Sequence, residues 1–153
     1  MNRDFKRVIV SARLSSLDRF KEYVWSPQSK VGFVHLAAHG SKTGINLIEG
    51  GRSWKQVAGV LKTIAPKLST SKQRVLTLSC CFSEYGFLKM KDNLKGHFTG
   101  CYYFSEDELS FATALTTWSM FYEQKTINRP QKKIIEKINS FFEDDVLKFG
   151  SIS

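Results

Sequence analysis

Two apolar runs constrain the fold of this chain more than any other feature. They are VGFVHLAAHG at residues 31–40 and RVLTLSCC at residues 74–81. Continuous apolar runs of this length are typical of strands buried on both faces of a parallel sheet. We expect the first strand to end at Ala37 or Ala38, with His39 and Gly40 just beyond it. The second strand is expected to end at Cys81, so both runs finish in residues that can carry chemistry.

The rest of the chain predicts helices that alternate with strands. A strand is expected at residues 7–12, a hairpin with its turn at Gly50 and Gly51, and a strand at residues 97–105. Helices are expected at residues 17–25, 54–68, 83–95, 108–124 and 131–149, with Ser53 capping the second. This alternation predicts an α/β fold with a mostly parallel sheet of about four to six strands, covered by helices on both faces. Residues 1–127 form the core of one domain, and residues 128–153 add a C-terminal amphipathic helix to it.

Composition narrows the classes of protein to consider. The chain has 153 residues, 12 of them Phe, which is enough apolar material for a core. Of its 23 Lys and Arg residues, 14 fall in residues 1–75 beside only 4 acidic residues. A nucleic acid could bind this basic half, but no nucleic-acid motif accompanies it, so a solvated basic surface is preferred.

Cysteine usage and hydropathy indicate a compartment. Cys80, Cys81 and Cys101 form no regular pattern, which predicts no disulfide framework and favours a reducing, cytoplasmic location. The absence of a C-x-x-C pair predicts no metal. The N-terminus lacks the apolar stretch of a signal peptide, and no run reaches the length of a membrane span, so we expect no membrane partner.

A cysteine and a histidine at neighbouring strand ends predict nucleophilic chemistry. In parallel sheets, functional residues gather at the carboxyl ends of the strands. A Cys nucleophile needs a base or an ion-pair partner, and His39 supplies one if the two strands are neighbours. Gly40 lets the main chain approach a substrate closely and offers its N–H to an oxyanion. The alternative is that both residues serve packing, as Cys and His often do.

The same segments resemble a known family. FVHLAAHGSKTGINL is similar to the His-Gly block of caspase-like (clan CD) cysteine peptidases, and RVLTLSCCFSEYG is similar to their Cys block. GGRSWKQVAGVLKTI resembles the segment that joins these blocks in the bacterial CHAT-type branch. GCYYFSEDELSFATALTTWSMFYEQ resembles the strand and Phe-rich helix that follow. The resemblance covers roughly residues 5–125.

This resemblance implies a caspase-like fold and peptide-bond hydrolysis without a cofactor. Aligning the Cys block makes Cys81 the nucleophile, with Cys80 in the place of a small residue. His39 becomes the general acid and base, and the amides of Gly40 and Cys81 form the oxyanion hole. Strand alternation points the two cysteines to opposite faces, so only one of them can serve.

The acidic cluster at residues 106–108 allows two interpretations. It can begin a helix capped by Ser105, where acids complement the helix dipole. It can also line a pocket for a basic P1 side chain, the one before the cleaved bond, with Asp107 as first choice and Glu106 beside it. His35, His97 and Cys101 are expected to have structural or surface roles.

Two functions remain open from the sequence. The first is a cysteine endopeptidase that acts on a protein or peptide substrate and prefers Lys or Arg at P1. The second is a catalytically silent caspase-like module, an adaptor or effector subunit that binds a regulatory protein partner. A nucleic-acid-binding domain ranks last because only charge supports it.

Overall fold

The computed structural model describes residues 32–69 and 72–153 and contains two sheets. The predicted strand at residues 7–12 and helix at residues 17–25 lie outside the described residues. The elements in chain order are β1 (Phe33–Ala37), β2 (His39–Gly40), β3 (Gly44–Leu47), β4 (Gly50–Ser53), α1 (Trp54–Ile64), β5 (Val75–Ser79), α2 (Ser83–Met90), β6 (Gly100–Phe104), α3 (Phe111–Thr126), α4 (Gln131–Phe142) and β7 (Leu147–Ser151). The main sheet has the order β1-β5-β6-β7, and β2-β3-β4 form a small second sheet.

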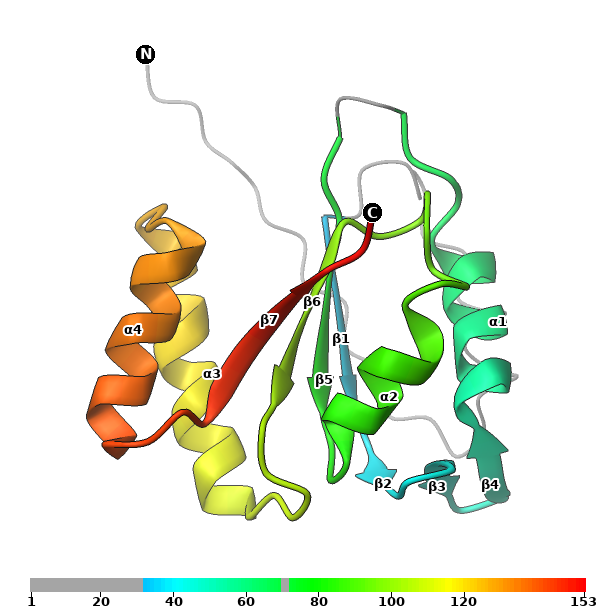
Figure 1. Ribbon diagram of the computed structural model, residues 1–153, viewed down its shortest axis with the longest axis horizontal. Helices are drawn as coiled ribbons and strands as arrows, with labels where there is room; N and C mark the ends of the chain where they lie inside the picture. The colour runs from blue at the N-terminus through cyan, green and yellow to red at the C-terminus, as the bar shows by residue number, and fades with distance from the viewer. Residues whose placement is uncertain (1–31, 70–71) are drawn as a thin grey trace.

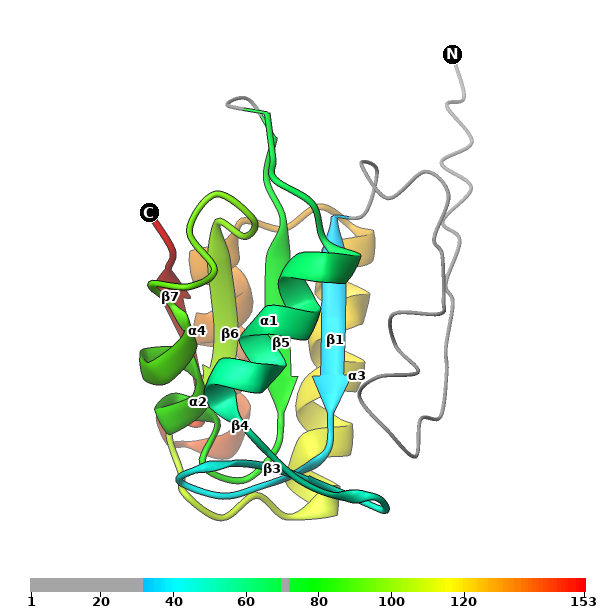
Figure 2. The ribbon, with the colours of Figure 1, turned by 90° about the vertical axis from the view of Figure 1, so that its right-hand side faces the viewer.

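The main sheet lies between two layers of helices. β1, β5 and β6 are parallel neighbours, and β7 joins β6 in the antiparallel direction. Helices α1 and α2 cover one face, and α3 and α4 cover the other (Figures 1 and 2). A mostly parallel α/β sheet with helices on both faces is therefore confirmed, with four strands. The small antiparallel sheet lies at the carboxyl end of β1, where the chain leaves the main sheet.

Each face of the sheet has its own apolar core. Alternate residues of β6 serve both, since all five residues of this strand are buried. Tyr103 stacks on Phe87 of α2, with ring centroids 4.8 Å apart, while Phe104 meets Trp118 of α3 edge-on at 5.3 Å. Cys101 belongs to the core on the α1 and α2 side, which confirms its structural role.

Helix α1 forms where the sequence predicts it. Ser53 caps the helix by accepting a hydrogen bond from the Gln56 N–H, and the Gln56 side chain accepts from the Ser53 N–H in return. This reciprocal capping box satisfies two amides that have no partner inside the helix. The helix ends at Ile64, earlier than predicted, because Pro66 has no N–H to continue the hydrogen-bond ladder.

The hairpin forms, but its turn is not at Gly50 and Gly51. Leu47 pairs with Gly50, so the turn residues are Ile48 and Glu49. The register is constrained at its other end, where a Cβ on Gly44 would lie 1.8 Å from the Arg52 carbonyl oxygen. Gly50 lies at the start of the returning strand, where its φ of +114° is a conformation that glycine adopts readily and other residues rarely do.

The predicted last helix is too long. It ends at Phe142, and Glu143 adopts a left-handed conformation with φ of 54°. The side-chain amide of Asn139 holds the turn-back by donating to the Leu147 carbonyl at 3.0 Å and accepting from the Leu147 N–H at 2.8 Å. The apolar residues after 145 keep helical spacing by coincidence, since burial against β6 as strand β7 determines their conformation.

His35 in β1 is held by polar and aromatic groups on the α3 side of the sheet. Its Nδ1 lies 2.8 Å from Thr77 Oγ1 and 2.9 Å from the Tyr122 hydroxyl. Its ring meets Trp118 edge-on, with centroids 5.0 Å apart. Part of the residue is exposed to solvent, but partial burial of the imidazole lowers the pKa of His35 below its usual value of 6.5.

This lowered pKa predicts a pH dependence of stability. The unfolded chain binds a proton at His35 more readily than the folded one, so stability should fall as pH drops through 6.5 and level off below the folded-state pKa. We expect the melting temperature to fall as the pH is lowered from 8 to 5, and we expect a smaller fall in His35→Gln. A wild-type melting temperature that stays constant or rises as the pH is lowered contradicts the prediction.

Candidate active site

The two apolar runs form neighbouring strands that end together. β1 and β5 pair in parallel with Ala37 opposite Ser79, and the Ala38 N–H donates to the Ser79 carbonyl at 3.2 Å. His39 and Cys81 each follow this last pair by two residues. Because neighbouring strands lie about 4.8 Å apart, both residues leave the sheet from the same place.

Gly40 brings the His segment against the Cys segment. A Cβ on Gly40 would lie 2.1 Å from the Cys81 carbonyl oxygen and 3.1 Å from Cys80 Cβ, so no larger residue fits without movement of the main chain. The Ser41 N–H donates to the Gly44 carbonyl, and strand alternation then makes Gly40 and Ile45 a non-hydrogen-bonded pair. The Gly40 amide therefore points away from β3.

A tight turn presents Cys81 between β5 and α2. Phe82 is left-handed, with φ of 55° and ψ of 30°, which is uncommon for a bulky residue. The Phe82 N–H donates to the Asp107 carbonyl at 2.7 Å. The buried Ser83 hydroxyl accepts from the Phe104 N–H at 2.9 Å. These bonds fix the turn to the end of β6 and to the loop after it. Among the described residues, the Cys81 N–H has no acceptor.

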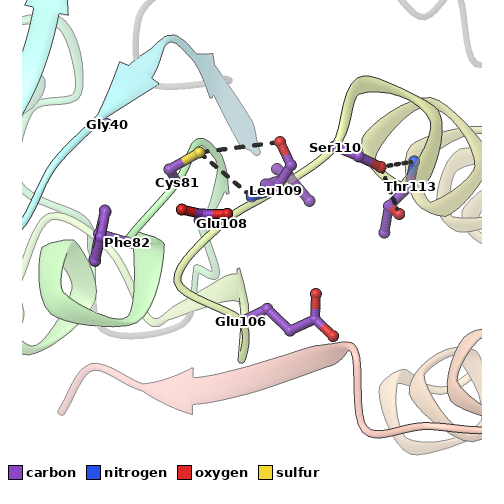
Figure 3. A pocket seen from close by; sticks show the side chains of 8 residues that line it. All are labelled: Gly40, Cys81, Phe82, Glu106, Glu108, Leu109, Ser110 and Thr113. Atoms are coloured by element: carbon purple, nitrogen blue, oxygen red, sulfur yellow. Dashed lines mark hydrogen bonds between the residues drawn. The ribbon is translucent and has the colours of Figure 1, made fainter.

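The Cys81 sulfur opens onto a pocket and contacts the loop after β6. It accepts a hydrogen bond from the Leu109 N–H at 3.3 Å and lies 3.9 Å from the Leu109 carbonyl oxygen (Figure 3). The pocket has a volume of about 540 Å³ and is lined by Gly40, Cys81, Phe82, Glu106, Glu108, Leu109, Ser110 and Thr113. It therefore combines a thiol, main-chain donors and two carboxylates.

The two adjacent cysteines have different environments. Cys80 is 2% exposed and packs in the core on the α1 and α2 side, whereas Cys81 is half-buried at the pocket. Burial, and then the neighbouring Cys81, raise the pKa of Cys80 to about 12. Burial also raises the pKa of Cys101 well above its usual value. Cys80 and Cys101 are therefore protonated near pH 7, and Cys81 is the thiol that a substrate can reach.

The histidines also separate into different roles. His39 is exposed on β2 opposite Asn46 and directly precedes the pocket residue Gly40. His97 is held by the main chain, with Nδ1 2.7 Å from the Ala65 carbonyl oxygen. His35 lies within β1 and contacts Thr77 and Tyr122. Of these three, His39 is the one that follows the end of β1, the strand paired with β5. Its side chain is exposed and does not line the pocket that contains Cys81.

The acidic cluster does not begin a helix. Helix α3 starts at Phe111, and its cap is Ser110, whose hydroxyl accepts from the Thr113 N–H at 3.0 Å. The expected cap Ser105 instead donates to the carbonyls of Asp145 and Val146 before β7. The helix-start interpretation of residues 106–108 is therefore wrong, because these residues form a bent connection between β6 and α3.

Glu106 and Glu108 line the pocket, whereas Asp107, between them, does not. Asp107 contributes its main-chain carbonyl to Phe82 instead. The sequence favours Asp107 because the middle of the cluster is the position least suited to a cap, and no local pattern singles out Glu108 as a pocket residue.

Gly40→Ala tests whether this close approach is needed. The added Cβ meets the Cys81 carbonyl, so we expect a loss of about 1–3 kcal/mol in the free energy of unfolding. Gly59→Ala is the matched control, because nothing lies within 4 Å of its Cβ position in helix α1. It should stabilise the protein by about 0.5–1 kcal/mol. Urea denaturation measures both, and equal effects contradict the prediction.

Comparison of the sequence with protein-family models and with curated proteins gives no match. Over residues 32–69 and 72–153, no three His, Cys, Asp or Glu side chains are grouped so that they could hold a metal ion. None of the described helices combines the length and the apolar content needed to cross a membrane.

Proposed function

We propose that the chain is a caspase-like cysteine endopeptidase with Cys81 as nucleophile and His39 as general acid and base. The observation that carries the proposal is the parallel register of β1 and β5, which starts both residues from the same strand pair. The contact of Gly40 with the Cys81 carbonyl supports it, since it brings the two chain segments together beyond the sheet.

The proposed reaction has two steps. His39 takes the proton of the Cys81 thiol, the sulfur attacks the carbonyl carbon of the scissile peptide, and the amides of Gly40 and Cys81 stabilise the negative oxygen that forms. His39 gives a proton to the leaving amine as the C–N bond breaks, which leaves an acyl group on the sulfur. A water molecule, deprotonated by His39, then attacks the thioester. The product acid is released and the thiol is restored.

The pocket supports a basic residue at P1. Phe82 and Leu109 offer apolar surface to the methylene stem of Lys or Arg, and Glu106 and Glu108 offer carboxylates to its charged end. An acidic P1 side chain would meet like charge there. The substrate class that fits is a protein or peptide cleaved after Lys or Arg. The cysteine pattern supports a cytoplasmic setting.

Fluorogenic peptides that differ only at P1 test this function. Wild type should cleave Lys and Arg peptides, and His39→Ala should lower kcat/KM by at least about a hundredfold because a general acid and base is lost. His39→Ala should keep the wild-type far-UV spectrum, since His39 is exposed. No cleavage of any peptide by wild type, with Cys81 reduced, counts against peptidase activity.

The second candidate, a silent module that binds a protein partner, is favoured by one observation. Phe111 and Leu115, one turn apart at the start of α3, are 81% and 57% exposed. Exposed apolar side chains of this size are common at protein contacts. This candidate would be favoured over the enzyme by two results together. Wild type would cleave no peptide, and it would bind a protein partner that Phe111→Ser and Leu115→Ser no longer bind.

A further inference from the structure

The loop after β6 reaches across the pocket to the nucleophile. Leu109, the residue before the cap of α3, places its N–H 3.3 Å from the Cys81 sulfur. Figure 3 shows the sulfur directed at this main-chain segment. An N–H group directed at a sulfur stabilises the thiolate more than the thiol, since a hydrogen bond is stronger when its acceptor is charged.

The donor is held in place from several sides. The Asp107 carbonyl accepts from the Phe82 N–H, and Ser105 bonds the main chain before β7 through its own N–H and its hydroxyl. Ser110 caps α3 directly after Leu109. A donor fixed on both sides costs little reorganisation when charge develops on the sulfur.

The charges around the sulfur make such a donor useful. Glu106 and Glu108 come from the same loop and line the pocket that contains the sulfur. The carboxylates disfavour a further negative charge, and the Leu109 amide opposes them at the sulfur itself.

We propose that the main-chain N–H of Leu109 is a catalytic group that stabilises the Cys81 thiolate, so that the loop after β6 completes the nucleophile. The inference rests on the proposed function in that Cys81 is taken as the nucleophile. The role belongs to the main chain, so the reactivity of the Cys81 thiol should survive a side-chain change at residue 109 but not the loss of its N–H.

The rate of Cys81 alkylation by iodoacetamide tests this in the full chain, with mass spectrometry locating the label. Leu109→Pro, which has no N–H, should react about tenfold more slowly at pH 7, as the loss of one hydrogen bond to a charged group implies. Its pH–rate profile should also move to higher pH. Leu109→Ala keeps the donor and should stay within about twofold of wild type. A faster Leu109→Pro, or an equal fall in both variants, overturns the proposal.

A second measurement avoids the risk that Leu109→Pro does not fold. In wild type, the Leu109 amide proton resonance should follow the alkylation pH profile of Cys81, and in Cys81→Ser it should not change. An amide that does not respond in wild type overturns the proposal. These measurements need no peptide substrate. If no peptide is cleaved but the alkylation and resonance results hold, the peptidase function fails while the role of Leu109 stands.

Discussion

Cys81→Ala is expected to abolish peptide hydrolysis, with a fall in kcat/KM of at least about a thousandfold. Cys81 is the thiol that lines the pocket, beside the Gly40 and Leu109 main chains. Removing its sulfur removes the atom that forms the acyl intermediate. The fold should persist, because the residue is only half-buried. Fluorogenic peptide assays with purified protein, together with thermal melting, measure both effects.

Cys80→Ala is the matched control, since it removes a thiol one residue away. Cys80 is buried in the core, so the variant should keep most of its activity and lose about 1 kcal/mol of stability as a small cavity forms. The two variants should therefore affect different quantities, activity at Cys81 and stability at Cys80. Exchanged phenotypes would place the nucleophile at Cys80 and shift the alignment of the Cys block by one residue.

The sequence predicted the part of the fold in which local pattern and burial agree. The apolar run that became β5 is buried on both faces, as its continuous pattern predicts. In β1, Val34 and Leu36 are buried but the alternate residues are exposed, so this strand is buried on one face. The capping residues of α1 likewise act within one turn of the chain. The parallel pairing of the two strands followed from the general behaviour of α/β sheets, whereas the register that aligns Ala37 with Ser79 did not.

The failures have a common physical cause, which is tertiary contact. Residues 147–149 have helical spacing after α4, yet pairing with β6 makes them a strand. Residues 106–108 carry the composition of a helix start, yet the Asp107 carbonyl accepts a hydrogen bond from the Phe82 N–H and the helix starts only at Phe111. The contact between Leu109 and the Cys81 sulfur joins residues 28 positions apart, and no local pattern predicts it.

The specificity prediction follows from the two carboxylates of that segment that line the pocket. Glu108→Gln is expected to lower kcat/KM for a Lys or Arg peptide by about tenfold, as the loss of one charge-assisted hydrogen bond implies. Glu106→Gln should act in the same direction. Both residues are exposed, so salt should weaken the preference of wild type for basic P1 residues. A peptide with an uncharged P1 residue should be affected much less by either variant.

Asp107→Asn is the matched control, because it removes one negative charge from the residue between Glu106 and Glu108. Its side chain does not line the pocket in the described part of the chain, and its main-chain carbonyl, which holds Phe82, is unchanged by the substitution. P1 preference should therefore stay as in wild type.

A panel of peptides varied only at P1, run on the three variants at two salt concentrations, separates the alternatives. A loss of preference in Asp107→Asn alone would restore the assignment that the sequence favours. Equal small losses in all three would mean that only the net charge of the loop matters, because a specific pocket distinguishes carboxylates by position whereas a diffuse field does not.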